Sequence, residues 1–73
     1  MVSLDSFFHP ASIAVIGASR NPAKIGHVIV ESLKMGYKGK IFPVNPLADE
    51  ILGLPCYPSV RDVKEEIDVA VIS

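Results

Sequence analysis

The chain has 73 residues, a formal net charge of −1, 49% apolar side chains and a single cysteine, Cys56. This near-neutral charge, without a lysine and arginine cluster, excludes the electrostatic footprint of a nucleic-acid-binding protein, and no apolar run approaches the length of a membrane span. One cysteine excludes an internal disulfide and offers no metal-ligand spacing. Because the N-terminus also lacks the positive start of a signal peptide, we expect a cytoplasmic protein.

The first predicted unit is a buried strand, a turn of small residues and a helix. Residues Ile13–Ile16 are apolar and lack polar alternation, which is typical of a strand buried on both faces of a parallel sheet. Three small residues, Gly17, Ala18 and Ser19, end this run. A helix is then predicted from about Pro22 to about Met35, with Asn21 as its N-cap.

This arrangement predicts an anion-binding turn. A helix that follows a small-residue turn directs free backbone N–H groups and partial positive charge at one point. The small side chains of Gly17–Ser19 allow a phosphate to approach the backbone. Arg20 and Lys24 place cationic side chains near the same point.

The predicted helix has an apolar face and two informative glycines. The face consists of Ile25, Val28, Ile29 and Leu33 at helical spacing. Gly36 is expected to end the helix in a left-handed conformation. Gly26 lies inside the helix, where we expect it to permit close packing of helix against strand.

The later elements are shorter and lead to a final strand. They are a strand at Ile41–Val44 containing Pro43, short extended pieces at Glu50–Leu52 and Leu54–Tyr57 around a turn at Gly53, a helix from Val60 to about Glu66 capped by Ser59 with Asp62, and a strand at Asp68–Ile72. Pro43 cannot donate to a sheet hydrogen bond, so its strand is expected either to pair poorly on one side at that point or to be bulged.

The pattern predicts an α/β fold with a mostly parallel sheet. The first strand is expected to be central, with Ile41–Val44 on one side and Asp68–Ile72 on the other. Phe7 and Phe8 are expected to pack against a sheet face. Because one long helix cannot cover both faces of such a sheet, residues 1–73 are expected to be the N-terminal part of a domain that continues beyond residue 73.

The topology predicts where a ligand binds. In open α/β sheets, ligands bind at the carboxyl ends of the strands, where the strand order reverses. In this chain the crevice would lie over three segments that are distant in sequence: Gly17–Arg20, Val44-Asn45-Pro46 and Ser73. These segments converge only if the predicted strand order is correct.

The residues at these strand ends restrict the ligand. The G-x-G-x-x-G pattern is absent and Asn45, rather than a carboxylate, ends the second strand, so both signals of an NAD site are missing. The Walker A pattern is also absent. A phosphate-bearing nucleotide remains, and coenzyme A (CoA), with its pyrophosphate and 3′-phosphate, meets that description. The spacing alone does not separate CoA from NADP.

Taken together, four segments resemble a known family. FFHPASIAVIGASRNPAKIG, GYKGKIFPVNP, EILGLPCYPSV and IDVAVIS, in this order, resemble the N-terminal CoA-binding domain of NDP-forming acyl-CoA synthetases. This family includes the ADP-forming acetyl-CoA synthetases and is related to the succinyl-CoA synthetase α subunit. The resemblance implies a Rossmann-like, three-layer domain. It also implies that Gly17–Arg20 line the CoA phosphates, that Val44-Asn45-Pro46 contact the nucleotide, and that the third contact begins at Ser73.

The resemblance has consequences for chemistry as well. It implies conversion of acyl-CoA, ADP and phosphate to an acid, ATP and CoA, with the catalytic histidine, the ADP or ATP and Mg²⁺ in other domains or a β subunit of an oligomeric enzyme. Neither His9 nor His27 lies in a matching motif, and we expect His27 at the surface or partly packed. Many relatives carry lysine where this chain has Leu47, so Arg20 or Lys24 would have to supply that charge.

Two alternatives remain open from the sequence. A stand-alone CoA-binding protein without catalysis would share all of these motifs, and the length of the full protein would separate it from a synthetase. An NAD(P)-dependent oxidoreductase domain is the other alternative, against which the missing glycines and the missing acidic residue count.

Overall fold

The computed structural model describes residues 10–73, so the expected packing of Phe7 and Phe8 lies outside the described residues. The elements, in chain order, are β1 (Ser12–Ile16), α2 (Ile25–Gly36), β2 (Lys40–Val44), β3 (Glu50–Ile51), β4 (Leu54–Pro55), the 3₁₀ helix η1 (Val60–Asp62) and β5 (Val69–Ile72). Between residues 10 and 73, no helix has the length and apolar character needed to cross a bilayer.

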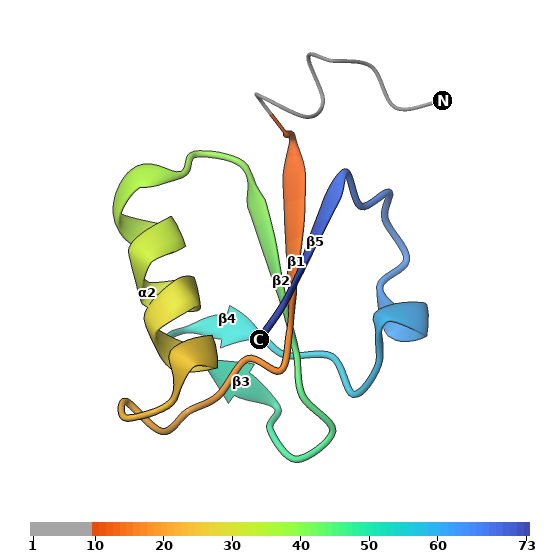
Figure 1. Ribbon diagram of the computed structural model, residues 1–73. Helices are drawn as coiled ribbons and strands as arrows, with labels where there is room; N and C mark the ends of the chain where they lie inside the picture. Colours follow the sequence, from red (N-terminus) through yellow and green to blue (C-terminus); the bar gives the residue numbers. More distant parts are fainter. Residues whose placement is uncertain (1–9) are drawn as a thin grey trace.

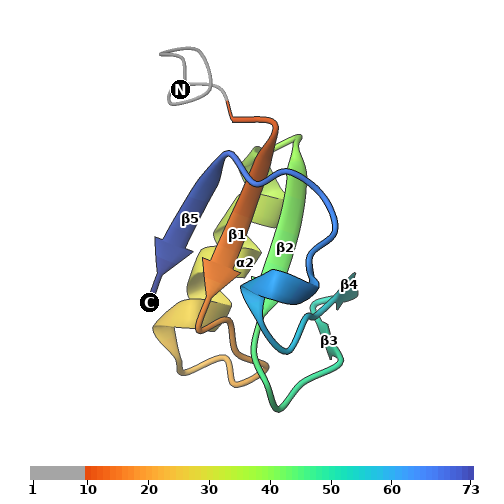
Figure 2. The ribbon, with the colours of Figure 1, turned by 90° about the vertical axis from the view of Figure 1, so that its right-hand side faces the viewer.

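The main sheet is parallel, with β1 at its centre. Its order is β2-β1-β5, as Figure 2 shows, and this confirms the predicted arrangement of the three strands. Ala14 lies opposite Phe42 on one side and Ala70 on the other. Because all three strands run the same way, their carboxyl ends meet at one edge of the sheet.

The two faces of the sheet are covered by different segments. Figure 1 shows α2 on one side and η1, with the segment that leads to β5, on the other. Side chains of β1 alternate between these layers. Val15 belongs to the cluster under α2, together with Val30, whereas Ala14 packs with Phe42 and Val63 on the opposite face. The described residues therefore form a Rossmann-like α/β arrangement.

Helix α2 begins later than the sequence predicted. We expected it to start near Pro22, but it starts at Ile25 with Lys24 as its N-cap. The reason is that the chain first closes a separate turn, in which the N–H of Lys24 donates to the carbonyl of Asn21 at 3.0 Å, and Lys24 itself is extended, with φ −93° and ψ 146°.

The predicted end of α2 is correct in position and wrong in conformation. The helix ends at Gly36, but this glycine does not have positive φ. Instead, the N–H of Tyr37 donates to the carbonyl of Leu33 at 2.7 Å and closes the last turn with extended backbone at Tyr37.

The apolar face predicted for α2 is only half correct. Ile29 and Leu33 pack against the core, whereas Ile25 and Val28 are 69% and 47% exposed. The stripe of α2 that contacts the sheet runs through Gly26, Ile29, Val30 and Leu33. A helix presents such a stripe to the sheet, and the missing side chain of Gly26 decides which stripe comes closest.

Strand β2 has an irregular outer edge, as its proline predicted. Val15 lies opposite Pro43 on the β1 side. On the other side, the N–H of Tyr57 donates to the carbonyl of Pro43, and the N–H of Asn45 donates to the carbonyl of Tyr57, both at 2.9 Å. This isolated bridge brings residues 56–58 beside the end of β2.

The remaining elements confirm their predicted type and differ in length. β3 and β4 pair antiparallel around the turn at Gly53. The predicted helix to Glu66 is the single turn η1, which ends at Asp62. Its capping box is present, because the N–H of Arg61 donates to the Oγ of Ser59 and the N–H of Ser59 donates to Asp62.

Candidate anion-binding site

A pocket of about 410 Å³ lies at the carboxyl ends of the three parallel strands. Segments from β1, α2, β2 and β5 contribute to it, which is the convergence that the sequence predicted. Its lining residues are Gly17, Ala18, Ser19, Lys24, Ile25, Gly26, Asn45 and Ser73. Six of them were predicted from the sequence, whereas Ile25 and Gly26 were not considered as lining residues.

The turn after β1 is held by its carbonyl groups. We call residues Gly17–Ser19 the anchored loop, because side chains from three other segments each donate a hydrogen bond to one of its carbonyls. These are Ser73 Oγ to Gly17 O at 3.0 Å, Asn45 Nδ2 to Ala18 O at 2.7 Å, and His27 Nδ1 to Ser19 O at 3.0 Å.

The N–H groups that follow the three anchored carbonyls belong to Ala18, Ser19 and Arg20, and they point away from the anchors. Every peptide bond between residues 10 and 73 is trans, so the N–H that follows each anchored carbonyl points in the opposite direction. Among the hydrogen bonds of residues 10–73, none uses the backbone N–H of Ala18, Ser19 or Arg20. Successive N–H groups without a protein partner in a turn are a recurring feature of anion-binding sites.

Two glycines permit this geometry. Gly17 has φ +90°, a conformation that other residues rarely adopt, and a Cβ there would lie 2.6 Å from Ser73 Oγ. A Cβ on Gly26 would lie 2.0 Å from the carbonyl oxygen of Gly17 and 3.0 Å from the Cα of Ala18. The first turn of α2 therefore rests directly on the backbone of the anchored loop, so Gly26 does permit close packing, but against the turn after β1 and not against the strand as predicted.

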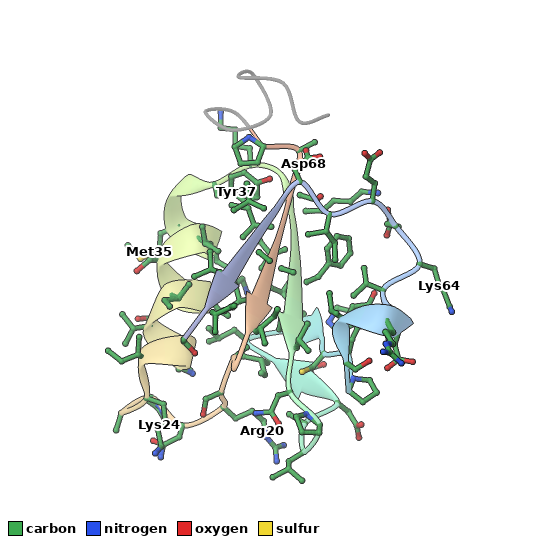
Figure 3. The ribbon with its side chains drawn as sticks, turned by 45° about the vertical axis from the view of Figure 1, so that its right-hand side comes forward. Arg20, Lys24, Met35, Tyr37, Lys64 and Asp68 are labelled. Atoms are coloured by element: carbon green, nitrogen blue, oxygen red, sulfur yellow. The ribbon has the colours of Figure 1, made fainter. Side chains whose placement is uncertain are left out.

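The two predicted cations occupy different positions. Lys24 lines the pocket, whereas Arg20 is exposed and lines neither this pocket nor its neighbour. Figure 3 shows both side chains at the same end of the molecule, with Tyr37 and Asp68 at the opposite end. Of the two predicted cations, Lys24 is thus the one that the structure places in the pocket lining.

The charge of Arg20 is one of several influences on the pKa of Cys56. Burial raises the pKa of the Cys56 thiol and outweighs the hydrogen bonds from Sγ to the carbonyls of Asn45 and Tyr57, which lower it. Asp49 raises this pKa further and the Arg20 guanidinium lowers it. The thiol is therefore mainly protonated near neutral pH, which is typical of a packed rather than a reactive cysteine.

A second pocket of about 440 Å³ adjoins the first across Gly17 and Asn45. Its lining residues are Ile16, Gly17, Val44, Asn45, Pro46, Pro58, Ser59 and Val60. Val44 and Pro46 of the predicted site therefore belong to this second pocket. Sequence reasoning missed Pro58–Val60, and the bridge between Val44 and Tyr57 that brings them here has no sequence signal.

Within residues 10–73, the structure contains no group of three or more histidine, cysteine, aspartate or glutamate side chains that could hold a metal ion. His27 is only 8% exposed and its Nδ1 contacts the carbonyl of Ser19, so our expectation of a surface or partly packed histidine was wrong. The first pocket offers a ligand backbone N–H groups and the cation Lys24, and the second pocket offers mainly apolar side chains.

Comparison with known proteins places this site in context. Residues 11–73 match a protein family described as a CoA binding domain. The chain is 55% identical over 71 residues to an ADP-forming acetate–CoA ligase II of Archaeoglobus fulgidus, covering 96% of this chain and 10% of that protein.

Solved structures agree. An acetyl-coenzyme A synthetase 1 of Ca. Korarchaeum cryptofilum, described as dinucleotide forming and determined with phosphate and ADP, superimposes with a TM-score of 0.87 at 51% identity, covering 100% of this chain and 16% of that one. A conserved hypothetical protein of Pyrococcus furiosus superimposes with a TM-score of 0.79 at 47% identity, covering 85% of this chain and 53% of that one. The chain therefore spans a tenth to a half of the relatives it resembles.

Proposed function

Because the chain belongs to the CoA binding domain family, we propose that its first pocket binds the phosphates of coenzyme A. The observation that carries this proposal is the anchored loop, whose carbonyls all accept side-chain hydrogen bonds and whose following N–H groups have no partner among residues 10–73. The residues fit such a ligand: an anion finds backbone donors, the start of α2 and Lys24, and the pocket lining contains no carboxylate.

The roles of the remaining residues follow from their positions. Ala18, Ser19 and Arg20 would bind phosphate oxygens through backbone N–H groups, and Lys24 would add a charge-assisted contact. The exposed side chain of Arg20 is free to reach the 3′-phosphate. Val44, Asn45 and Pro46 would contact the nucleotide from the second pocket, and Ser73 would support Gly17.

For the whole protein, we propose the activity of an NDP-forming acyl-CoA synthetase, which converts acyl-CoA, ADP and phosphate to an acid, ATP and CoA. Residues 1–73 would be the N-terminal part of the CoA-binding domain, and this domain would continue beyond residue 73. The catalytic histidine, the nucleotide and Mg²⁺ would belong to other domains or to a β subunit of an oligomeric, cytoplasmic enzyme. The identity to an ADP-forming acetate–CoA ligase supports this proposal.

A stand-alone CoA-binding protein is the second candidate. It is favoured by one observation, the match to a hypothetical protein of which this chain covers 53%. An NAD(P)-dependent oxidoreductase has less support. Asn45, at the end of β2, uses its Oδ1 to accept the N–H of Leu47 and its Nδ2 to bind Ala18, so its amide is already engaged where a dinucleotide site would offer a carboxylate to ribose.

Dissociation constants of the full-length protein test the proposal. Calorimetric titration at one salt concentration should give tighter binding for CoA than for NAD. Removal of the 3′-phosphate, as in dephospho-CoA, should weaken binding about tenfold if a cation reaches it. Equal affinity for NAD and CoA would overturn the assignment.

Single variants assign the cationic contacts. Lys24→Ala should weaken binding of both CoA and dephospho-CoA by about tenfold, because the contact is to the phosphates at the loop. Arg20→Ala should reduce the difference between the two ligands. Lys38→Ala is the matched control, since this exposed lysine follows Tyr37 at the opposite end of the molecule. An equal loss in the control would show a long-range charge effect instead of contact.

A further inference from the structure

His27 is a buried polar side chain that neither the predicted motif nor the proposed phosphate contacts use. It lies in the first turn of α2 and is 8% exposed. Its Nδ1 is 3.0 Å from the carbonyl oxygen of Ser19, and its backbone N–H donates to the carbonyl of Lys24 at 3.1 Å. The side chain therefore connects the start of the helix to the last residue of the anchored loop.

The direction of this hydrogen bond is fixed by chemistry. A carbonyl oxygen can only accept a hydrogen bond, so Nδ1 of His27 must carry the proton. The bond fixes the orientation of the peptide plane between Ser19 and Arg20. Because that peptide is trans and planar, the N–H of Arg20 then points away from His27. Without this anchor, the plane can rotate at low cost, since nothing else binds the Ser19 carbonyl among residues 10–73.

We infer that His27 is a positioning residue for anion binding: it donates from Nδ1 to Ser19 and so directs the backbone N–H of Arg20 toward the phosphate of the ligand. This inference rests on the proposed function, because it assigns a role within the same CoA site. His27 acts through the Ser19–Arg20 peptide and does not itself touch the ligand.

The position of His27 sets the length of the side chain that can act as donor here. Gly26, the preceding residue, holds the helix so close to the loop that a Cβ would lie 2.0 Å from the Gly17 carbonyl. A side chain with its donor two bonds beyond Cβ, as Nδ1 of His27 is, reaches the Ser19 carbonyl from this distance. Asparagine shares the donor position of Nδ1, and glutamine carries its amide nitrogen at the position of Nε2.

The experiment compares three variants of the full-length protein with the wild type by titration with CoA. His27→Phe keeps a planar ring and removes the donor, and it should raise the dissociation constant about tenfold, as expected for a lost hydrogen bond in a buried site. His27→Asn should restore affinity to within about threefold of the wild type. His27→Gln, which places its amide one bond too far, should remain as weak as His27→Phe.

The outcomes separate this inference from the proposed function. Wild-type protein that does not bind CoA would overturn the proposed function itself. Wild-type protein that binds CoA, with His27→Phe of equal affinity, would overturn the role of His27 alone. If His27→Phe does not fold, the folded asparagine and glutamine variants decide: equal dissociation constants would overturn the inference, because a merely structural role does not distinguish the two amides.

Discussion

Substitution of Gly26 by alanine tests the contact that joins α2 to the anchored loop. Two opposing effects act on this variant. Alanine in place of glycine inside a helix stabilises the folded state by about 1 kcal/mol. The added Cβ, however, would lie 2.0 Å from the Gly17 carbonyl oxygen and 2.9 Å from its carbon. These are backbone atoms, which cannot rotate away as a side chain can.

The magnitude follows from the displacement required. Real Cβ atoms essentially never approach closer than 3.0 Å, so the helix and loop must separate by about 1 Å at this point. Overpacking of this kind costs about 1–3 kcal/mol, which exceeds the gain in helix propensity. Because the displaced atoms belong to the loop that would bind phosphate, Gly26→Ala should weaken CoA binding by at least about tenfold and lower the unfolding free energy by about 1 kcal/mol.

The matched control is Gly36→Ala, at the other end of the same helix. A Cβ on Gly36 meets no atom within 4 Å, and its φ is not positive. This variant should be at least as stable as the wild type and should bind CoA unchanged. Urea denaturation and calorimetric titration of both full-length variants provide the measurements. If Gly26→Ala matched Gly36→Ala in both stability and affinity, the proposed close approach of helix and loop would be refuted.

Two further predictions concern the turn and the thiol. Gly17→Val should weaken CoA binding more than tenfold, because a branched residue resists φ +90° and its Cβ would collide with Ser73. The control is Gly53→Ala, at φ +81° with no atom closer than 3.8 Å, which should lose stability and keep its affinity for CoA. Equal affinities of the Gly17→Val and Gly53→Ala variants in titration would contradict the argument. Iodoacetamide should alkylate Cys56 more slowly in the folded protein than in denaturant at pH 8, because burial raises the pKa of the thiol and so reduces the fraction of thiolate. The alkylation rate of the folded protein should increase as the pH rises above 9. Equal rates for the folded and unfolded protein at pH 8, measured by mass spectrometry, would contradict this prediction.

The sequence predicted the parts of the fold that depend on repeated local patterns. The buried run before Gly17 indicated a central parallel strand, and the strand order then followed from general rules of α/β topology. That order places Asn45 and Ser73 beside the first turn, and the structure brings both side chains to the loop carbonyls. Gly26 inside the predicted helix likewise indicated a close approach of α2 to a neighbouring segment.

Other features depend on contacts that no local pattern contains. The helix begins late because a separate turn, closed by the Lys24 N–H and the Asn21 carbonyl, precedes it and Lys24 is extended. Ile25 and Val28 look like core residues in the sequence, but the stripe around Gly26 faces the sheet instead. The burial of His27 depends on the position of a carbonyl eight residues earlier, and side-chain periodicity does not report this position.

The three hydrogen bonds to the anchored loop have a consequence for biosynthesis. They join residues separated by 8, 27 and 56 positions in the sequence, for His27, Asn45 and Ser73 respectively. A growing chain that leaves the ribosome can therefore form them only in that order. Each doubling of the enclosed length adds only about 0.6 kcal/mol of closure entropy, so the last bond is delayed by translation more than it is opposed by thermodynamics. A nascent chain that has not yet exposed β5 has two of the three anchors, and its Gly17 carbonyl still faces water.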